Sequence, residues 1–201
     1  MTNQQLQLEN SKITAFSSGV GGAGSISLPE TENLTLMNGS EISVSTGEKG
    51  NAGSITVPLG QNISLDNSKI TASTSGQGNT GIINLRGTRK IQLVNNSEIS
   101  NAVDEKGVGN AREINLDTAE LSLENSEITS STSGLGNAGS ITVPDATSIT
   151  LDNSTISTEI KEKGGRINPV TSPSPRETLN LRNQSEITAS TSGEGNAGKS
   201  G

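Results

Sequence analysis

The sequence predicts an all-β protein that folds as a right-handed parallel β-helix of about seven rungs, each with 28–30 residues and three short strands. The first observation is a recurring motif, in which two alternating apolar residues precede Asn, Gly or Gln, then Ser, a variable residue and Ile. Its copies begin at Leu6, Leu34, Ile63, Ile91, Leu121, Ile149 and Leu179. The second observation is that apolar and polar residues alternate within each copy, with no 3.6-residue period to indicate a helix. Residues 1–201 are therefore interpreted as a single repeat array.

Each unit contains three strand-like pieces. In the third unit these are residues 63–65, 68–71 and 83–85, which carry apolar residues at every second position, as expected of strands with one buried face. A glycine-rich loop, such as residues 134–139, separates the second piece from the third. Proline directly follows the third piece in several units, where a missing N–H group is easily tolerated. These prolines are Pro29, Pro58 and Pro144.

Stacked rungs place equivalent residues in columns. The column before the recurrent Ser consists of Asn10, Gly39, Asn67, Asn96, Asn125, Asn153 and Gln184. Asn and Gly tolerate the left-handed backbone of a sharp corner, and stacked amides can bond along the rod, so we interpret this column as structural. The next column is Ser11, Ser40, Ser68, Ser97, Ser126, Ser154 and Ser185. We expect a ladder of turn-forming or inward-pointing hydroxyls there, because no catalytic base accompanies these serines.

The residue before the second-strand Ile is expected to point outward. This column reads Lys12, Glu41, Lys69, Glu98, Glu127, Thr155 and Glu186. Its first four members alternate in sign, which makes neighbouring rungs attract and disfavours slippage by one rung. Glu98 followed by Glu127 breaks the alternation at a small cost.

The composition excludes several classes of function. Only 28% of residues are hydrophobic, and the chain contains one Phe and no Cys, His, Trp or Tyr. The absence of Cys and His removes disulfides, the usual zinc, copper and haem ligands, and His or Cys catalysis. A net charge of −7 argues against nucleic acid as a partner, and no apolar run is long enough to insert into a membrane. Asp66 and Asp152 occupy equivalent positions three rungs apart, which offers neither a carboxylate pair nor a metal cage. We predict no catalytic, cofactor-binding or metal-binding residues and no cofactor.

Two nucleotide-binding patterns occur and are interpreted as structural. Residues 19–24, 76–81, 134–139 and 193–198 match G-x-G-x-x-G, and residues 193–200 match the P-loop pattern G-x-x-x-x-G-K-S. Both patterns bind phosphate only when a helix follows, and a strand or the end of the sequence follows here. A repeated glycine loop produces such matches by chance.

The sixth unit is the least regular. Residues 161–165 replace the usual glycine loop, and Pro169 stands where the third strand carries an apolar residue. Pro173 and Pro175 follow shortly after. We expect a protruding loop over residues 159–178.

The rung consensus is clearest in ISLDNSKITASTSGQGNTG (residues 63–81) and LSLENSEITSSTSGLGNAGSITV (residues 121–143). It resembles the repeat region of filamentous-haemagglutinin-like exoproteins, particularly the cyanobacterial ones of the two-partner secretion type. The resemblance implies a right-handed β-helix stalk on the outer cell surface or secreted from the cell, exported by an outer-membrane transporter partner, with adhesive roles in some members. It transfers no catalytic residues. Neither end of the sequence reads as a capping repeat, so we expect a piece of a longer protein whose end rungs associate end to end.

Three functions remain in competition at this point. The first is a non-catalytic structural or adhesive stalk, with cell-surface glycans or neighbouring rods as partners. The second is a β-helix protein that acts on or binds polysaccharide, which requires an acidic or basic cluster across adjacent rungs. The third is ice binding through a Thr/Ser column, made up of Thr14, Ser43, Thr71, Ser100, Thr129, Ser157 and Thr188.

Overall fold

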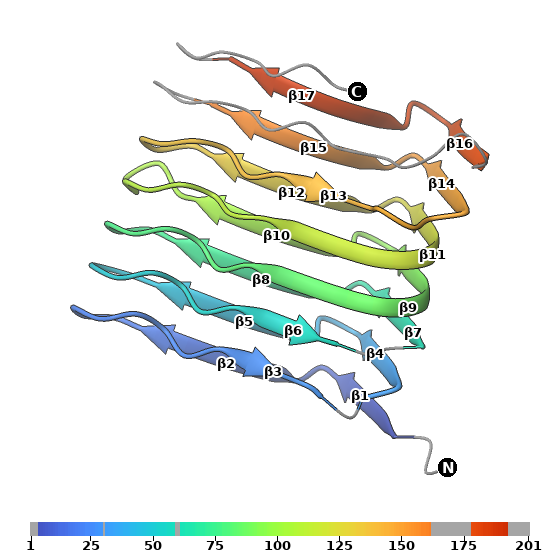
Figure 1. Cartoon of the computed structure of the whole chain (residues 1–201), viewed down its shortest axis with the longest axis horizontal. Coiled ribbons are helices and arrows are strands. Elements are labelled where there is room, and N and C mark those ends of the chain that lie inside the picture. Colours follow the sequence, from blue (N-terminus) through green and yellow to red (C-terminus); the bar gives the residue numbers. More distant parts are fainter. Residues whose placement is uncertain (1–3, 30, 59–60, 162–177, 193–201) are drawn as a thin grey trace.

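The computed structural model describes residues 4–29, 31–58, 61–161 and 178–192. All regular elements in these ranges are strands, and every pairing between them is parallel. The strands stack rung upon rung into a β-solenoid, as Figure 1 shows. The parallel β-helix predicted from the repeat is confirmed.

Two columns of seven strands run the length of the rod. The first-strand column contains β1 (Gln5–Glu9), β4 (Asn33–Met37), β7 (Asn62–Asp66), the later parts of β9 (Ile83–Val94) and β11 (Ile114–Glu124), β14 (Ser148–Asp152) and β16 (Thr178–Arg182). The second-strand column contains β2 (Lys12–Ser17), β5 (Glu41–Thr46), β8 (Lys69–Thr74), β10 (Glu98–Val103), β12 (Glu127–Thr132), β15 (Thr155–Ile160) and β17 (Glu186–Thr191).

The register of the strands follows the repeat. Leu6 pairs with Leu34, Leu34 pairs with Ile63, and the series continues through Ile91, Leu121 and Ile149 to Leu179. These are the residues at which the repeat units begin. The register is strongly specified, because a slip of one residue would turn every apolar side chain of a strand away from the core.

The third strand differs from the expectation in two units. It is a separate short strand in β3 (Ile26–Ser27), β6 (Ile55–Val57) and β13 (Ile141–Thr142), which precede Pro29, Pro58 and Pro144. In β9 and β11, by contrast, it continues without a break into the first strand of the next unit. Arg86 and Asp117 stand in place of the proline there, and the two strands continue through a register shift in which Asp117 lies opposite both Arg86 and the left-handed Gly87.

The apolar residues of the strands fill the interior of the rod. Leu65, Ile70 and Ile83 of the third rung are completely buried, and equivalent residues form one cluster from Leu8 to Ile156. Each such side chain contributes about 1.5–3 kcal/mol of hydrophobic stabilisation. The cluster is continuous because each rung covers the apolar residues of the next.

One interior column changes from apolar to polar along the rod. Val44 and Ala72 of the lower rungs are followed by Asn101, Ser130 and Thr158, all fully buried. The Asn101 Nδ2 donates to the backbone carbonyl of Arg112 at 2.6 Å. Its Oδ1 is a buried side-chain oxygen without a partner among the described residues. The sequence patterns do not indicate this polar stretch, because Asn101 lies at a position that other rungs fill with small or apolar residues.

The corners adopt the left-handed backbone expected of them. All seven residues of the corner column have positive φ angles between 46° and 81°. Three corners contain a second left-handed residue directly before the first, namely Asn38, Asn95 and Asn183. The corner therefore exists in a one-residue and a two-residue form, which accounts for part of the variation in unit length.

The glycine-rich loops stack backbone against backbone. Isolated parallel bridges connect residues at the centre of each loop, from Val20 through Lys49, Gln77 and Val108 to Leu135. A Cβ atom placed on Gly78, Gly109 or Gly136 would overlap the carbonyl oxygen of the glycine one rung below. Glycine recurs here because a side chain would force neighbouring rungs apart.

We predict that Gly76→Ala destabilises the rod by about 1–3 kcal/mol, the usual cost of overpacking, because the added Cβ would overlap the carbonyl of Glu48. Gly19→Ala is the matched control. Gly19 holds the equivalent position in the first rung, where an added Cβ would meet no other atom within 4 Å, and neither glycine has a positive φ. Urea unfolding followed by far-ultraviolet circular dichroism measures both. Equal losses in the two variants would contradict the stacking argument.

Candidate functional site

The candidate site lies at the corner of the rod where each first strand turns into the second strand of the same rung. A groove of about 670 Å³ lies along it in the middle of the rod. We call it the corner groove, and its lining residues are Lys69, Asn95, Asn96, Ser97, Glu98, Asn125, Ser126, Glu127, Asn153 and Thr155. These residues come from four successive rungs and are all polar or charged.

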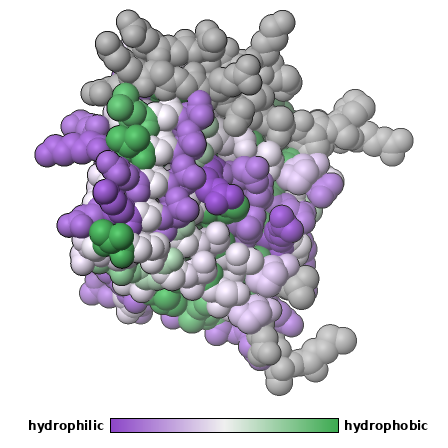
Figure 2. Space-filling view, turned by 60° about the vertical axis from the view of Figure 1, so that its left-hand side comes forward, coloured by the Kyte–Doolittle hydropathy of each residue, from purple (hydrophilic) through white to green (hydrophobic). Residues whose placement is uncertain are grey.

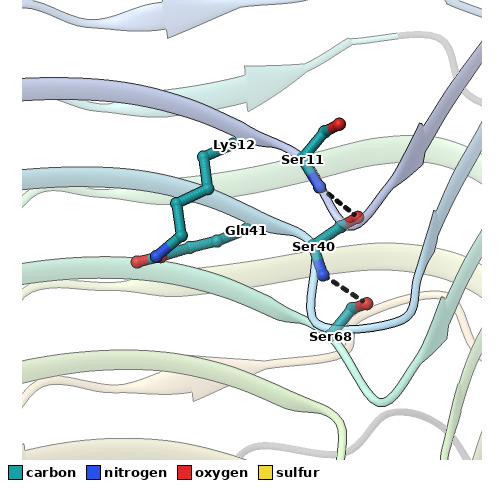
Figure 3. Close-up of polar contacts among 5 residues, drawn as sticks. All are labelled: Ser11, Lys12, Ser40, Glu41 and Ser68. Carbon is teal, nitrogen blue, oxygen red and sulfur yellow. Dashed lines mark hydrogen bonds and ion pairs between the residues drawn. The ribbon is translucent and has the colours of Figure 1, made fainter.

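The floor of this corner is an unbroken ladder of serines. The backbone N–H of Ser11 donates to the Oγ of Ser40, and that of Ser40 donates to the Oγ of Ser68, as Figure 3 shows. The same bond repeats at 3.1–3.3 Å through Ser97, Ser126 and Ser154 to Ser185. The predicted hydroxyl ladder is confirmed.

Each serine also closes its own corner. Its Oγ donates to a backbone carbonyl two or three residues earlier, at 2.6–2.9 Å in all seven rungs. A left-handed residue turns the chain away from the strand ladder and interrupts the regular backbone bonding. The hydroxyl supplies the acceptor that the serine N–H group of the rung below would otherwise lack.

The two-residue corners are held by carboxylates of the preceding rung. The Nδ2 of Asn95 donates to Asp66 at 2.8 Å, and that of Asn183 donates to Asp152 at 2.5 Å. Asn38 donates to Glu9 in the same way at 3.1 Å. Asp66 and Asp152 therefore have structural partners. The described residues contain no group of three or more His, Cys, Asp or Glu side chains that could hold a metal ion.

The expected ladder of corner amides is found at one step only within the described chain, where Asn153 donates to Asn125 at 2.7 Å. The alternation of one-residue and two-residue corners shifts the other amides out of line. A longer amide ladder lies in the glycine loops, where the Oδ1 atoms of Asn51, Asn79 and Asn110 each accept a backbone N–H at 2.8–2.9 Å. This second ladder is not among the sequence predictions. The recurrence of Asn directly after a loop glycine was the available signal.

The charged column lines one wall of the corner, outside the core. Lys12 pairs with Glu41 at 2.7 Å (Figure 3), and Lys69 pairs with Glu98 at 2.5 Å. The hydrogen bond from Lys12 lowers the pKa of Glu41 below its ordinary value, although partial burial opposes this shift. The bond to Glu98 raises the pKa of Lys69. The predicted attraction between rungs is thus present as two ion pairs.

Glu127 occupies the position where the alternation fails. It lies between Glu98 and Thr155 in the parallel register, so no lysine stands opposite it. Partial burial and, to a smaller extent, repulsion by Glu98 raise its pKa, while attraction to Lys69 and Lys161 lowers it by less. Glu127 is therefore a carboxylate in the corner groove that no cation of the column neutralises directly.

The nucleotide-binding patterns have no helix behind them in the structure. The loops at 19–24, 76–81 and 134–139 lead into β3, β9 and β13, so no helix N-terminus is available to hold phosphate. Residues 193–200, which match the P-loop pattern, lie outside the described residues. Most of the irregular sixth-unit segment, residues 162–177, lies outside them as well.

The loop face of the rod is polar with separate apolar spots. Val20, Val108 and Leu135 are exposed at the loop centres; Val108 and Leu135 are direct neighbours, and Lys49 and Gln77 separate them from Val20. Figure 2 shows two apolar areas on this side, with hydrophilic side chains between them. The Thr/Ser column considered for ice binding lies in the second strands, and its members Ser43 and Ser100 are buried. Thr14 is exposed and the other members are half-buried, so the column does not present an evenly exposed face to a flat ice surface.

The chain matches no protein-family model, no curated protein and no solved structure. A search of the described residues for a helix long and apolar enough to cross a membrane also finds none.

We predict that Ser97→Ala destabilises the rod by about 1–3 kcal/mol, because it removes the acceptor for the buried N–H of Ser68 and the donor to the carbonyl of Val94. Ser122→Ala, at an outward-facing position of β11, is the control and is expected to change stability by less than about 0.5 kcal/mol. Urea midpoints measure the difference. A loss of the same size in the control would refute a specific role for the ladder.

We predict opposite pH dependences for two glutamates of the charged column. The folded pKa of Glu127 is raised, so its contribution to stability is present below 4.5, the ordinary value, and is lost as the pH rises through the folded pKa. The folded pKa of Glu41 is lowered, so its contribution is present above 4.5 and is lost as the pH falls through the folded pKa.

At neutral pH, Glu127→Gln should therefore stabilise and Glu41→Gln should destabilise the rod, each by less than about 1 kcal/mol because water screens both groups. Both differences from wild type should shrink as the pH falls below the folded pKa of the respective glutamate. Thermal unfolding at a series of pH values measures this. Effects of the same sign in the two variants would show that the column does not act through charge.

Proposed function

We propose that the chain is a non-catalytic structural rod with an adhesive role, forming part of a secreted, surface-displayed exoprotein. The observation that supports this is the serine ladder, which is continuous through all seven rungs. In this ladder the recurrent serine of each rung is used in a bond between rungs. Such a repeat produces a stiff extended scaffold, as expected of a stalk.

The location is proposed from the sequence resemblance to haemagglutinin-like repeats. In that proposal an outer-membrane transporter exports the parent protein, and the rod stands outside the cell. Digestion of intact cells with an added protease tests this. Fragments of this chain should be released before the cells lyse, and recovery only after lysis would count against an exposed rod.

Adhesion is proposed to involve cell-surface glycans or neighbouring rods. The corner groove supports this, because its exposed amides and carboxylates match the hydrogen-bonding needs of sugar hydroxyls. The groove also runs across several rungs, which suits an extended partner better than a small molecule.

We predict that the purified chain is retained on at least one immobilised cell-surface polysaccharide, with weak affinity at each site and stronger retention at high surface density. A panel of neutral, acidic and basic polysaccharides, with an uncoated surface as the control, measures retention. No retention on any member of the panel would remove the adhesive role and leave that of a stalk.

The alternative is an enzyme that cleaves polysaccharide. One observation favours it, since Glu127 has a raised pKa and lies in a groove beside a second carboxylate, as a general acid would. The same panel distinguishes the two functions. A fall in polymer viscosity that Glu127→Gln abolishes would establish the enzyme, and unchanged viscosity would leave the non-catalytic rod.

A further inference from the structure

The charged column leaves the carboxylate of Glu127 without a cation from the column itself. On the rungs below, Glu41 and Glu98 each accept a lysine ammonium from the same column. Glu127 repeats their position in the parallel register but has Glu98 on one side and Thr155 on the other. A positive group placed beside Glu127 would restore the alternation that the column shows elsewhere.

The surroundings of Glu127 favour a ligand that also carries hydroxyl groups. The exposed side chains of Asn96, Asn125 and Asn153 line the same groove, and each amide can both donate and accept hydrogen bonds. No lining residue is aromatic, so recognition depends on hydrogen bonds and charge. The lining carries one positive group, Lys69, and two negative ones, Glu98 and Glu127, so a cationic ligand is favoured.

The groove is long enough for several sugar units. Its lining extends from Lys69 on the third rung to Thr155 on the sixth. Three steps of about 4.8 Å give a length of about 14 Å along the rod. A single sugar ring would occupy only part of it.

From this geometry we propose that the corner groove binds a polysaccharide bearing free amino groups, with one ammonium paired to Glu127 and neighbouring hydroxyls bonded to the corner asparagines. This inference rests on the proposed adhesive function and names the class of glycan. The net charge of −7 on the whole chain also favours a basic polymer.

The test compares two probes that differ in charge, a glucosamine tetrasaccharide with free amines and its fully N-acetylated counterpart. Isothermal titration is carried out at about pH 6 and low salt, where most of the sugar amino groups are protonated. The free-amine probe should bind the wild-type chain at least about fivefold more tightly, and added salt should reduce this preference. Glu127→Gln should abolish the preference while the chain stays folded.

Glu124→Gln is the matched control, because Glu124 is an exposed glutamate of the same rung that does not line the groove. It should bind as wild type does. Equal affinity for the two probes, an unchanged preference in Glu127→Gln, or no binding of either probe would overturn the inference. The proposed adhesive function would survive that result if the chain were still retained on a neutral or acidic polysaccharide, and would fall only if the whole panel failed.

Discussion

The structure depends on in-register stacking of parallel rungs at the spacing of a β-sheet. Neighbouring rungs lie about 4.8 Å apart, and the backbone of each rung must form hydrogen bonds to the next one. This holds also at the corners and loops, where the strands end. The strands meet this requirement by themselves. At the corners, the left-handed residue breaks the strand ladder, and the serine hydroxyl restores the bonding. In the loops, glycine allows one backbone to lie directly on another.

Stacking also explains why the polar residues repeat as strictly as the apolar ones. Each residue has its own equivalent as a neighbour above and below, so its side chain must be compatible with copies of itself. Hydroxyls and amides satisfy this condition because they both donate and accept. A charge does not, and the column that contains Lys12, Glu41, Lys69 and Glu98 alternates in sign for that reason. Glu127 departs from the rule, and its carboxylate is therefore available to a group from outside the chain.

Part of the candidate site was accessible from the sequence. The serine column, the left-handed corners and the unpaired position of Glu127 each follow from aligning the repeats, because equivalent residues of a solenoid must stack. The corner groove was not predictable in this way. Its lining combines corner residues, such as Asn125, with residues of the following strand, such as Glu127. Only the angle of the corner places both side chains along one groove. The asparagine ladder of the glycine loops was open to prediction and was missed, although Asn follows the loop glycine in every described loop except the first.

The sequence by itself determined the fold class, the unit boundaries and the register. Each unit carries the same period of apolar residues and the same kinds of corner residue, and stacking aligns these copies from rung to rung. The tertiary structure decided how the third strand continues in β9 and β11, because the register shifts there and the left-handed Gly87 accommodates the extra residue of β9. It also decided which amides meet. One-residue and two-residue corners differ by a few ångströms along the chain, and that shift directs Asn95 to Asp66 and leaves Asn125 to accept from Asn153.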